Sequence, residues 1–236
     1  MRIVVNHLTR MQPGYICLAG LDLATGRHVR PVVKLANLTP RWLSRHGGPF
    51  DMAHVINLGL TGPKPDRPHV EDQVFQPCFA KFVEVEEAEA FWERLTGVSQ
   101  TKLSAIFGSE LKPAGRGRYG TAEGKGQASL GCWQAQGQPR LYLAKNQEGL
   151  QIRLAFSDGE CTVDARVTDL RLCAADHVTS DTKKVQELAE RMRASESLIL
   201  SVGLTRAWAS APGKPRLHWL QVNNIHLKED PTWRLG

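Results

Sequence analysis

The chain has 236 residues, of which 42% are hydrophobic and 23% charged, and its 30 Lys and Arg outnumber 24 Asp and Glu to give a net charge of +6. This composition predicts one large or two small globular domains and excludes a wholly disordered chain. No apolar run approaches the roughly 20 residues that cross a bilayer, and the first residues lack the apolar core of a signal peptide. We therefore expect a cytoplasmic protein with no membrane partner.

The first half of the chain is predicted to consist of strands around one short helix. Strands are expected where apolar and β-branched residues cluster, at residues 1–6, 15–23, 27–33, 54–60 and 79–85. The Ala-Thr-Gly turn signal at residues 24–26 makes a hairpin of the second and third. Residues 86–95 place Phe91 and Leu95 at helical spacing and predict a helix.

The second half follows a glycine-rich stretch, residues 112–126, which we expect to be a mobile loop. Strands are then expected at residues 140–144, 150–156, 161–172, 198–204 and 217–227. Residues 180–194 are the clearest helix, because Ser180 or Asp181 can cap it and apolar residues recur at every third or fourth position. Many short strands with two helices predict small barrels or sandwiches rather than a parallel α/β sheet.

The cysteines favour no covalent framework. They are odd in number, widely spaced and without a C-x-x-C pair: Cys17, Cys78, Cys132, Cys161 and Cys173. Disulfide frameworks and structural zinc sites need paired or closely spaced cysteines. We therefore expect reduced thiols in a cytoplasmic protein, with no metal and no other cofactor.

Positive charge is concentrated in three bands of the sequence. Residues 23–50 and 197–228 contain no acidic residue, and residues 111–147 contain only Glu123. The bands supply most of the cations that we consider for binding: Arg30, Arg41, Arg45, Arg116, Arg118, Lys125, Arg206, Lys214 and Arg216. If folding brings the bands together, they form one electropositive face that attracts phosphates. Basic surface is also common in proteins that bind no nucleic acid, so charge alone leaves both interpretations open.

Segments near the two ends of the chain resemble a known family. Residues 14–32 (GYICLAGLDLATGRHVRPV) resemble the N-terminal signature of the prokaryotic dual OB-containing family, in which this pattern forms the first hairpin. Residues 200–206 (LSVGLTR) and 218–225 (HWLQVNNI) are similar to the closing strands of that family. The resemblance implies a mainly β protein with a few helices, built as two small OB-like β-barrels packed together. It also implies a role in binding nucleic acid.

On this basis we expect three regions. Residues 1–110 would form an N-terminal OB-like barrel with a short helix, and residues 111–128 a glycine-rich basic loop. Residues 129–236 would form a C-terminal OB-like barrel with one amphipathic helix. OB barrels bind oligonucleotides on one open face, where aromatic side chains stack on bases and cations follow the backbone.

Aromatic residues lie beside cations in all three bands. Trp42 follows Arg41, Tyr119 follows Arg118, and Trp208 comes two residues after Arg206. For Tyr119, which lies in the glycine-rich stretch without apolar periodicity, we expect an exposed ring that stacks on a base. For Trp42 and Trp208, base stacking and core packing remain open alternatives. Trp219 alternates with apolar residues and is expected in the core.

Three arginines near the first hairpin form a second set of candidates. Arg10 follows the first predicted strand and is a candidate for contact with phosphate. Arg27 lies at the turn and is expected to be solvated. Arg30 lies within the return strand, where a phosphate contact and an ion pair with Asp22 on the neighbouring strand are both open.

Signals for catalysis are weak. The chain has no G-x-S-x-G, no P-loop and no H-E-x-x-H motif. The closest group of metal-ligating types is His46, Asp51 and His54, which could serve a metal-dependent nuclease because imidazole and carboxylate suit divalent ions. Solvated side chains in a loop are the competing interpretation, and we favour a protein without enzymatic activity.

The sequence therefore predicts a cytoplasmic prokaryotic protein that holds single-stranded or locally opened DNA or RNA on a basic face, without chemistry of its own. Arg10 and the nine cations of the bands would contact phosphates, while Trp42, Tyr119 and Trp208 would stack on bases. A metal-dependent nuclease using His46, Asp51 and His54 is one alternative. An adaptor that binds an acidic protein partner is another. The sequence leaves the oligomeric state open.

Overall fold

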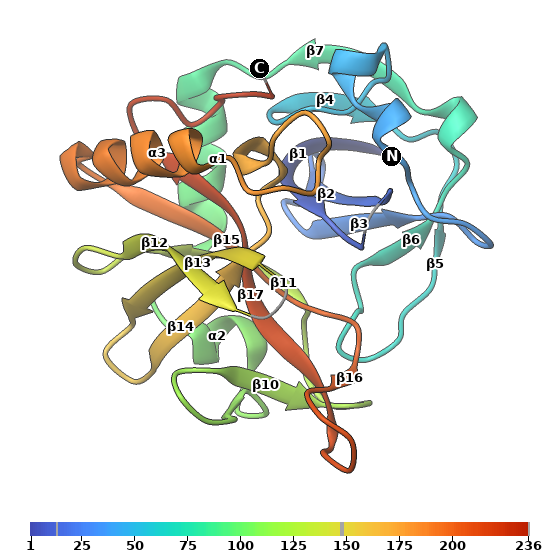
Figure 1. The fold of residues 1–236 in the computed structure, drawn as a ribbon. Helices are drawn as coiled ribbons and strands as arrows, with labels where there is room; N and C mark the ends of the chain where they lie inside the picture. Colours follow the sequence, from blue (N-terminus) through green and yellow to red (C-terminus); the bar gives the residue numbers. More distant parts are fainter. Residues whose placement is uncertain (13, 147–148, 236) are drawn as a thin grey trace.

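The computed structural model describes residues 1–12, 14–146 and 149–235, which fold into two lobes that each contain one β-sheet (Figure 1). We call residues 1–98 the first lobe and residues 99–235 the second lobe. The first sheet has the order β5-β6-β3-β2-β1-β4-β7. Its strands are β1 (Arg2–Arg10), β2 (Ile16–Asp22), β3 (His28–Val32), β4 (His54–Asn57), β5 (Gly62–Pro63), β6 (Asp72–Val74) and β7 (Lys81–Val85).

The second sheet is built around the long strand β17, drawn in red in Figure 1. Its main order is β12-β13-β14-β17-β15-β11-β8, and β16 and β10 add to β17 beyond this order. The strands are β8 (Ser99–Gln100), β9 (Lys112–Pro113), β10 (Tyr119–Ala122), β11 (Leu130–Gln134), β12 (Arg140–Asn146), β13 (Gly149–Ser157), β14 (Thr162–Val167), β15 (Leu198–Leu204), β16 (Trp208–Ala209) and β17 (Arg216–Leu227).

Helices close the ends and faces of the sheets. The α-helices are α1 (Ala88–Val98), α2 (Leu103–Phe107) and α3 (Thr182–Ala194). Short 3₁₀ turns are η1 (Pro40–Trp42), η2 (Ser44–His46), η3 (Pro77–Phe79) and η4 (Leu170–Leu172). Asp181 caps α3 by accepting hydrogen bonds from the backbone of Lys183 and Lys184, as its position before the helix predicts. None of the helices in the described part of the chain is long and apolar enough to cross a membrane.

The prediction of a mainly β fold is confirmed, although the strand orders of the two sheets do not close into barrels. The three-region division of the chain stays a prediction. The second sheet begins at β8, ahead of the expected boundary at residue 110, because β8 pairs in parallel with β11. Helix α2 also packs in the apolar core of the second lobe through Leu103 and Phe107.

The expectation that residues 112–126 form a mobile loop is wrong. β9 pairs with β10, and β10 pairs with β17 through Gly120 opposite Trp219. A Cβ atom at position 120 would lie only 3.1 Å from the His218 carbonyl oxygen, so glycine permits this close pairing. The tight turn at residues 115–117 is also fixed, because the Gly117 carbonyl accepts a hydrogen bond from the Asp164 amide at 2.8 Å. At position 120 glycine therefore serves close backbone packing.

The lobes meet along the free edge of β1. Beyond Val4, where β4 stops pairing with β1, the amide of Arg10 donates to the Thr168 carbonyl at 2.9 Å. The amide of Leu8 donates to the side chain of Asn224 at 2.7 Å. Unpaired polar groups on a buried strand edge are costly. The second lobe therefore completes the hydrogen bonding of a first-lobe strand.

A buried polar network continues this junction. Ser201 on β15 donates to the Asn6 carbonyl at 2.8 Å and contacts His226 Nε2 at 3.0 Å. The side chain of Asn223 contacts His7 Nδ1 at 2.9 Å. Burial lowers the pKa of His226 to about 3, so its imidazole is neutral at physiological pH. The lobes are thus joined by neutral polar groups rather than by ion pairs at this point.

Candidate nucleic-acid interface

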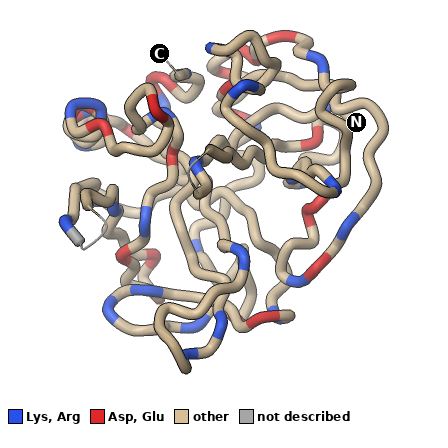
Figure 2. Tube along the Cα trace, turned by 45° about the vertical axis from the view of Figure 1, so that its right-hand side comes forward, with Lys and Arg blue, Asp and Glu red and all other residues tan. Residues whose placement is uncertain are grey.

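Two of the three basic bands are brought together by strand pairing at the lower end of the molecule. β10 carries the second band alongside β17, and β16 pairs with the other side of the same part of β17, through Trp208 opposite Leu217. The cations gathered here are Lys112, Arg116, Arg118, Lys125, Arg206, Lys214 and Arg216. With Trp208 and Trp219, we call them the basic aromatic face. Figure 2 shows several Lys and Arg positions close together on these lower loops.

The centre of this face is a cluster of two indoles, tilted at 48° to each other, and a guanidinium. Trp208 is 47% exposed, and its ring lies 5.6 Å from the ring of Trp219, centroid to centroid. The guanidinium carbon of Arg118 lies 3.8 Å from the centre of the Trp219 ring. Trp219 Nε1 donates to the Trp208 carbonyl at 3.1 Å, which fixes the two tryptophans relative to each other. Trp219 is buried, as expected, and forms the floor below the exposed indole.

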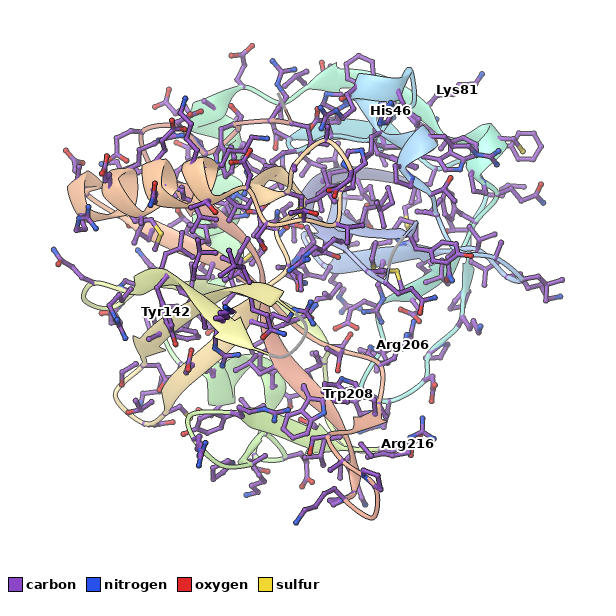
Figure 3. The ribbon with its side chains drawn as sticks, in the orientation of Figure 1. His46, Lys81, Tyr142, Arg206, Trp208 and Arg216 are labelled. Carbon is purple, nitrogen blue, oxygen red and sulfur yellow. The ribbon has the colours of Figure 1, made fainter. Side chains whose placement is uncertain are left out.

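Arg206 and Arg216 flank the exposed indole. Figure 3 shows Arg206, Trp208 and Arg216 close together at the lower right of the molecule. Arg216 donates to the Ala207 carbonyl at 3.0 Å and lies 3.5 Å from Glu123, with both side chains exposed. An exposed ion pair of this kind contributes little, so a phosphate can replace the carboxylate at low cost.

Arg30 does not belong to an exposed surface. It is 6% exposed, and its Nε donates to Asp72 Oδ1 at 2.6 Å. The partner is Asp72 on the parallel strand β6, where the register places the two residues opposite each other, and not Asp22. Arg206 reaches the other carboxylate oxygen of Asp72 from the second lobe at 2.5 Å. The expected phosphate contact of Arg30 is therefore wrong, because its charge is used in a buried ion pair within the first lobe, and the contact of Arg206 with the same carboxylate links the lobes.

Two of the aromatic candidates also lie elsewhere than on the face. Tyr119 begins β10, is half-buried and packs against the core of the second lobe. The expectation of an exposed Tyr119 is wrong, because strand pairing turns this side chain inward. Trp42 is half-buried in η1 against the core of the first lobe, with the Arg41 guanidinium 5.3 Å from its ring.

The other binding candidates of the first lobe, Arg10, Arg41 and Arg45, are separate from the face. Arg41 and Arg45 lie on η1 and η2, and η2 ends at His46, which Figure 3 places at the upper right, far from Trp208. Arg10 is half-buried at the lobe junction, where its Nη1 donates to the Val178 carbonyl at 2.6 Å. Folding therefore joins the second and third bands but leaves these members of the first band apart.

The alternative metal group of His46, Asp51 and His54 is not assembled. Asp51 is buried and accepts hydrogen bonds from Ser44 and the Met52 amide, while the His54 ring contacts the Pro49 carbonyl at 2.9 Å. His46 faces His177 of the second lobe instead. Within the described residues, no three His, Cys, Asp or Glu side chains are grouped so that they could hold a metal ion.

The contacts of Asp72 and Trp219 with arginines were not predicted from the sequence. Asp72 lies outside the three basic bands, yet it accepts from Arg30 and Arg206. Trp219 was assigned to the core alone, although Arg118 covers its ring. The signal in the sequence for a surface role of Trp219 was its position three residues after Arg216 on the same strand. No local pattern points to Asp72, because its partners come from distant segments.

The family of the chain follows from its match to a known protein family. A family model described as the dual OB-containing domain matches residues 1–225. The chain belongs to the dual OB-containing domain family. The match spans both lobes and confirms the resemblance seen in the sequence. No curated protein matches the chain. Within the dual OB-containing domain, the basic aromatic face lies wholly on the second lobe, at β9, β10, β16 and β17 and the loops that follow β9, β10, β15 and β16.

Proposed function

We propose that the protein binds single-stranded or locally opened nucleic acid on the basic aromatic face of its second lobe. Members of OB folds often use such a surface for oligonucleotides. The observation that carries the proposal is the exposed indole of Trp208, supported from below by Trp219 and flanked by Arg206 and Arg216. A nucleobase can stack on this indole while the guanidinium groups contact the adjoining phosphates.

The charge of the face supports the same function. Arg116 and Lys214 are exposed on turns at its edge, and the acidic residue Glu123 is exposed and paired with Arg216. Each phosphate that replaces a counterion here adds a salt-dependent contribution to affinity. Arg206 is partly neutralised by Asp72, so we expect it to contribute less than Arg216.

The proposal is tested by fluorescence anisotropy with labelled single-stranded and duplex oligonucleotides over a series of salt concentrations. We expect the full chain to bind single strands more tightly than duplex, with affinity that falls as salt rises. Binding should weaken when Arg216 is changed to Ala. A matched control is Lys81→Ala, since Lys81 is an exposed cation on β7 at the far upper right of Figure 3.

The two variants distinguish binding at the basic aromatic face from binding through the general positive charge of the protein. Equal weakening in Arg216→Ala and Lys81→Ala would mean that general charge, not this face, is responsible. Absence of binding at low salt, or binding without salt dependence, would contradict the proposed function outright.

A further inference from the structure

A pocket opens between the two lobes at one border of the basic aromatic face. Its volume is about 440 Å³, within the range of about 300–1,000 Å³ typical of small-ligand sites. Its walls are the end of α2 with the residues that follow it, 107–110, the turn after β10, residues 124–127, and Arg67 of the first lobe. In Figure 1 the segment between β5 and β6, which carries Arg67, descends toward the lower strands of the second lobe.

The pocket is continuous with the basic aromatic face. Lys125 belongs to both, because it is exposed on the turn that lines the pocket. Glu123 lies two residues earlier on the same turn and is 3.5 Å from Arg216, which flanks Trp208. A single strand held at the exposed indole of Trp208 can therefore reach the pocket by following the cations from Arg216 to Lys125.

Two cations reach the pocket from different lobes. Arg67 is exposed, and its Nη1 donates to the Gly126 carbonyl at 3.2 Å, which holds the guanidinium at the pocket. The other two nitrogens of this guanidinium have no acceptor among the described residues, and Lys125 has no ion-pair partner among them. A positioned guanidinium with free donors suits the oxygens of a phosphate.

The backbone of the turn supplies further donors. Gly124 and Gly126 have φ values of 74° and 94°, a conformation that glycine adopts without strain. In residues 1–12, 14–146 and 149–235 their amides find no acceptor. A Cβ atom at Gly124 would meet no atom within 4 Å, so the space beside this backbone is open. Free backbone amides beside cations are a common basis of anion sites.

The residues of the pocket favour a phosphate over a base. Among the described residues that line it, Phe107 is the only aromatic, and it is fully buried in the core of the second lobe. The pocket therefore offers no ring for stacking, whereas its cations and amides match phosphate oxygens. Glu110 is the acid that lines the pocket, and it is exposed. Its charge offsets one of the two cations and so weakens the attraction for an anion.

We propose that this pocket binds a phosphate group of the nucleic-acid strand whose base stacks on Trp208, and that Arg67 extends the binding surface onto the first lobe. The inference rests on the proposed function and adds the path of the strand. The strand runs from the indole past Arg216 to the junction of the lobes. A strand held in this way contacts both lobes, although the basic aromatic face belongs to the second lobe.

The experiment measures the anisotropy of labelled oligothymidylates of four to about 16 nucleotides, the range of sites on single OB folds, with the full chain. Oligomers too short to span from Trp208 to the pocket should bind the wild type and Arg67→Gln equally, which also shows that the variant is folded. For long oligomers Arg67→Gln should lower affinity about tenfold, the contribution of one hydrogen bond to a charged group. It should also reduce the slope of log affinity against log salt by about 0.7. Lys64→Gln is the matched control, because Lys64 is an exposed cation of the same segment and does not line the pocket.

An acid variant makes the test directional. Glu110→Gln removes the acid and leaves both cations, so it should tighten the binding of long oligomers several-fold at low salt. The inference is overturned if the wild type binds oligomers but Arg67→Gln weakens the long ones no more than Lys64→Gln does, and in that case the proposed function stands. If the wild type binds no oligomer of any length, the proposed function is overturned together with this inference.

Discussion

Asn224 on β17 replaces a missing strand neighbour for Leu8 on β1. Its Oδ1 accepts from the Leu8 amide at 2.7 Å, and its Nδ2 donates to the Leu8 carbonyl at 3.2 Å. Asn224 is fully buried, and so is Leu8. One side chain thus satisfies both backbone groups of a strand residue in the other lobe, where no water is available to do so.

Replacing Asn224 with Ala should therefore destabilise the protein strongly. Each buried backbone group left without a partner costs about 1–3 kcal/mol, so the loss of both partners should lower the free energy of unfolding by roughly 2–6 kcal/mol. Urea unfolding followed by circular dichroism measures it. Asn57→Ala is the matched control, because the half-buried Asn57 side chain accepts a bond from the nearby Gly59 amide, and its loss should cost about 1 kcal/mol or less.

The ion pair of Arg30 with Asp72 predicts a large difference between two substitutions. Asp72→Ala leaves Arg30 buried and unpaired, so it should cost about 3–5 kcal/mol of unfolding free energy. Arg206→Ala removes the half-exposed partner and keeps the buried pair, so it should cost about 1 kcal/mol or less. Thermal or urea unfolding of both variants checks this. Equal losses would show that the two arginines are energetically equivalent.

Base stacking and charge should contribute to oligonucleotide affinity in ways that differ in their salt dependence. Trp208→Ala should weaken oligonucleotide binding by about 1–3 kcal/mol without changing the salt dependence, because it removes a stacking platform and no charge. Arg216→Ala should lower the slope of log affinity against log salt by about 0.7, the value for one phosphate of a single strand. A change of slope in Trp208→Ala would argue against base stacking on this indole.

Acid should destabilise the junction of the lobes through His226. Its imidazole has a pKa of about 3 in the folded protein, because burial and then the nearby Arg171 disfavour its charged form, against 6.5 for an ordinary histidine. The stability that neutral His226 contributes is complete above pH 6.5 and is lost as the pH falls from 6.5 toward 3, since only the unfolded chain takes up the proton there.

The loss from this one group is about 1.4 kcal/mol per pH unit. Burial lowers the pKa values of His7 and His69 as well, so the wild type should fall more steeply than one group requires. Urea unfolding at pH 7, 6 and 5 gives the slope. His226→Gln should reduce the slope by about the contribution of one histidine. An unchanged slope would place the acid sensitivity elsewhere.

Local patterns in the sequence were sufficient for the fold class and for most elements. The apolar run at the start predicted β1, and the turn at residues 24–26 joins β2 to β3 as expected. Asp181 marked the start of α3. These features depend on neighbours a few residues apart, which is why they can be recognised without a structure. The expected strand at residues 161–172 instead ends at Val167, where η4 follows.

The site depended on contacts that no local pattern contains. Composition rightly pointed to cations beside tryptophans, but Tyr119 and Arg30 turn inward because β10 pairs with β17 and β3 pairs with β6. His46 was predicted, in the alternative hypothesis, as a metal ligand together with Asp51 and His54. The side chain that it contacts in the fold is His177, which lies 131 residues away along the chain.

The sequence by itself determined that this chain forms many short strands, carries its positive charge in bands and belongs with dual OB-containing proteins. Only the tertiary structure decided which cations remain on the surface and which are held in buried ion pairs. The physical reason is that a charge can be assigned to solvent, to a carboxylate or to a ring only when its distant neighbours are known. Arg118 and Arg30 are chemically alike in the sequence. In the fold, Arg118 covers the ring of Trp219, whereas Arg30 is held in a buried ion pair with Asp72.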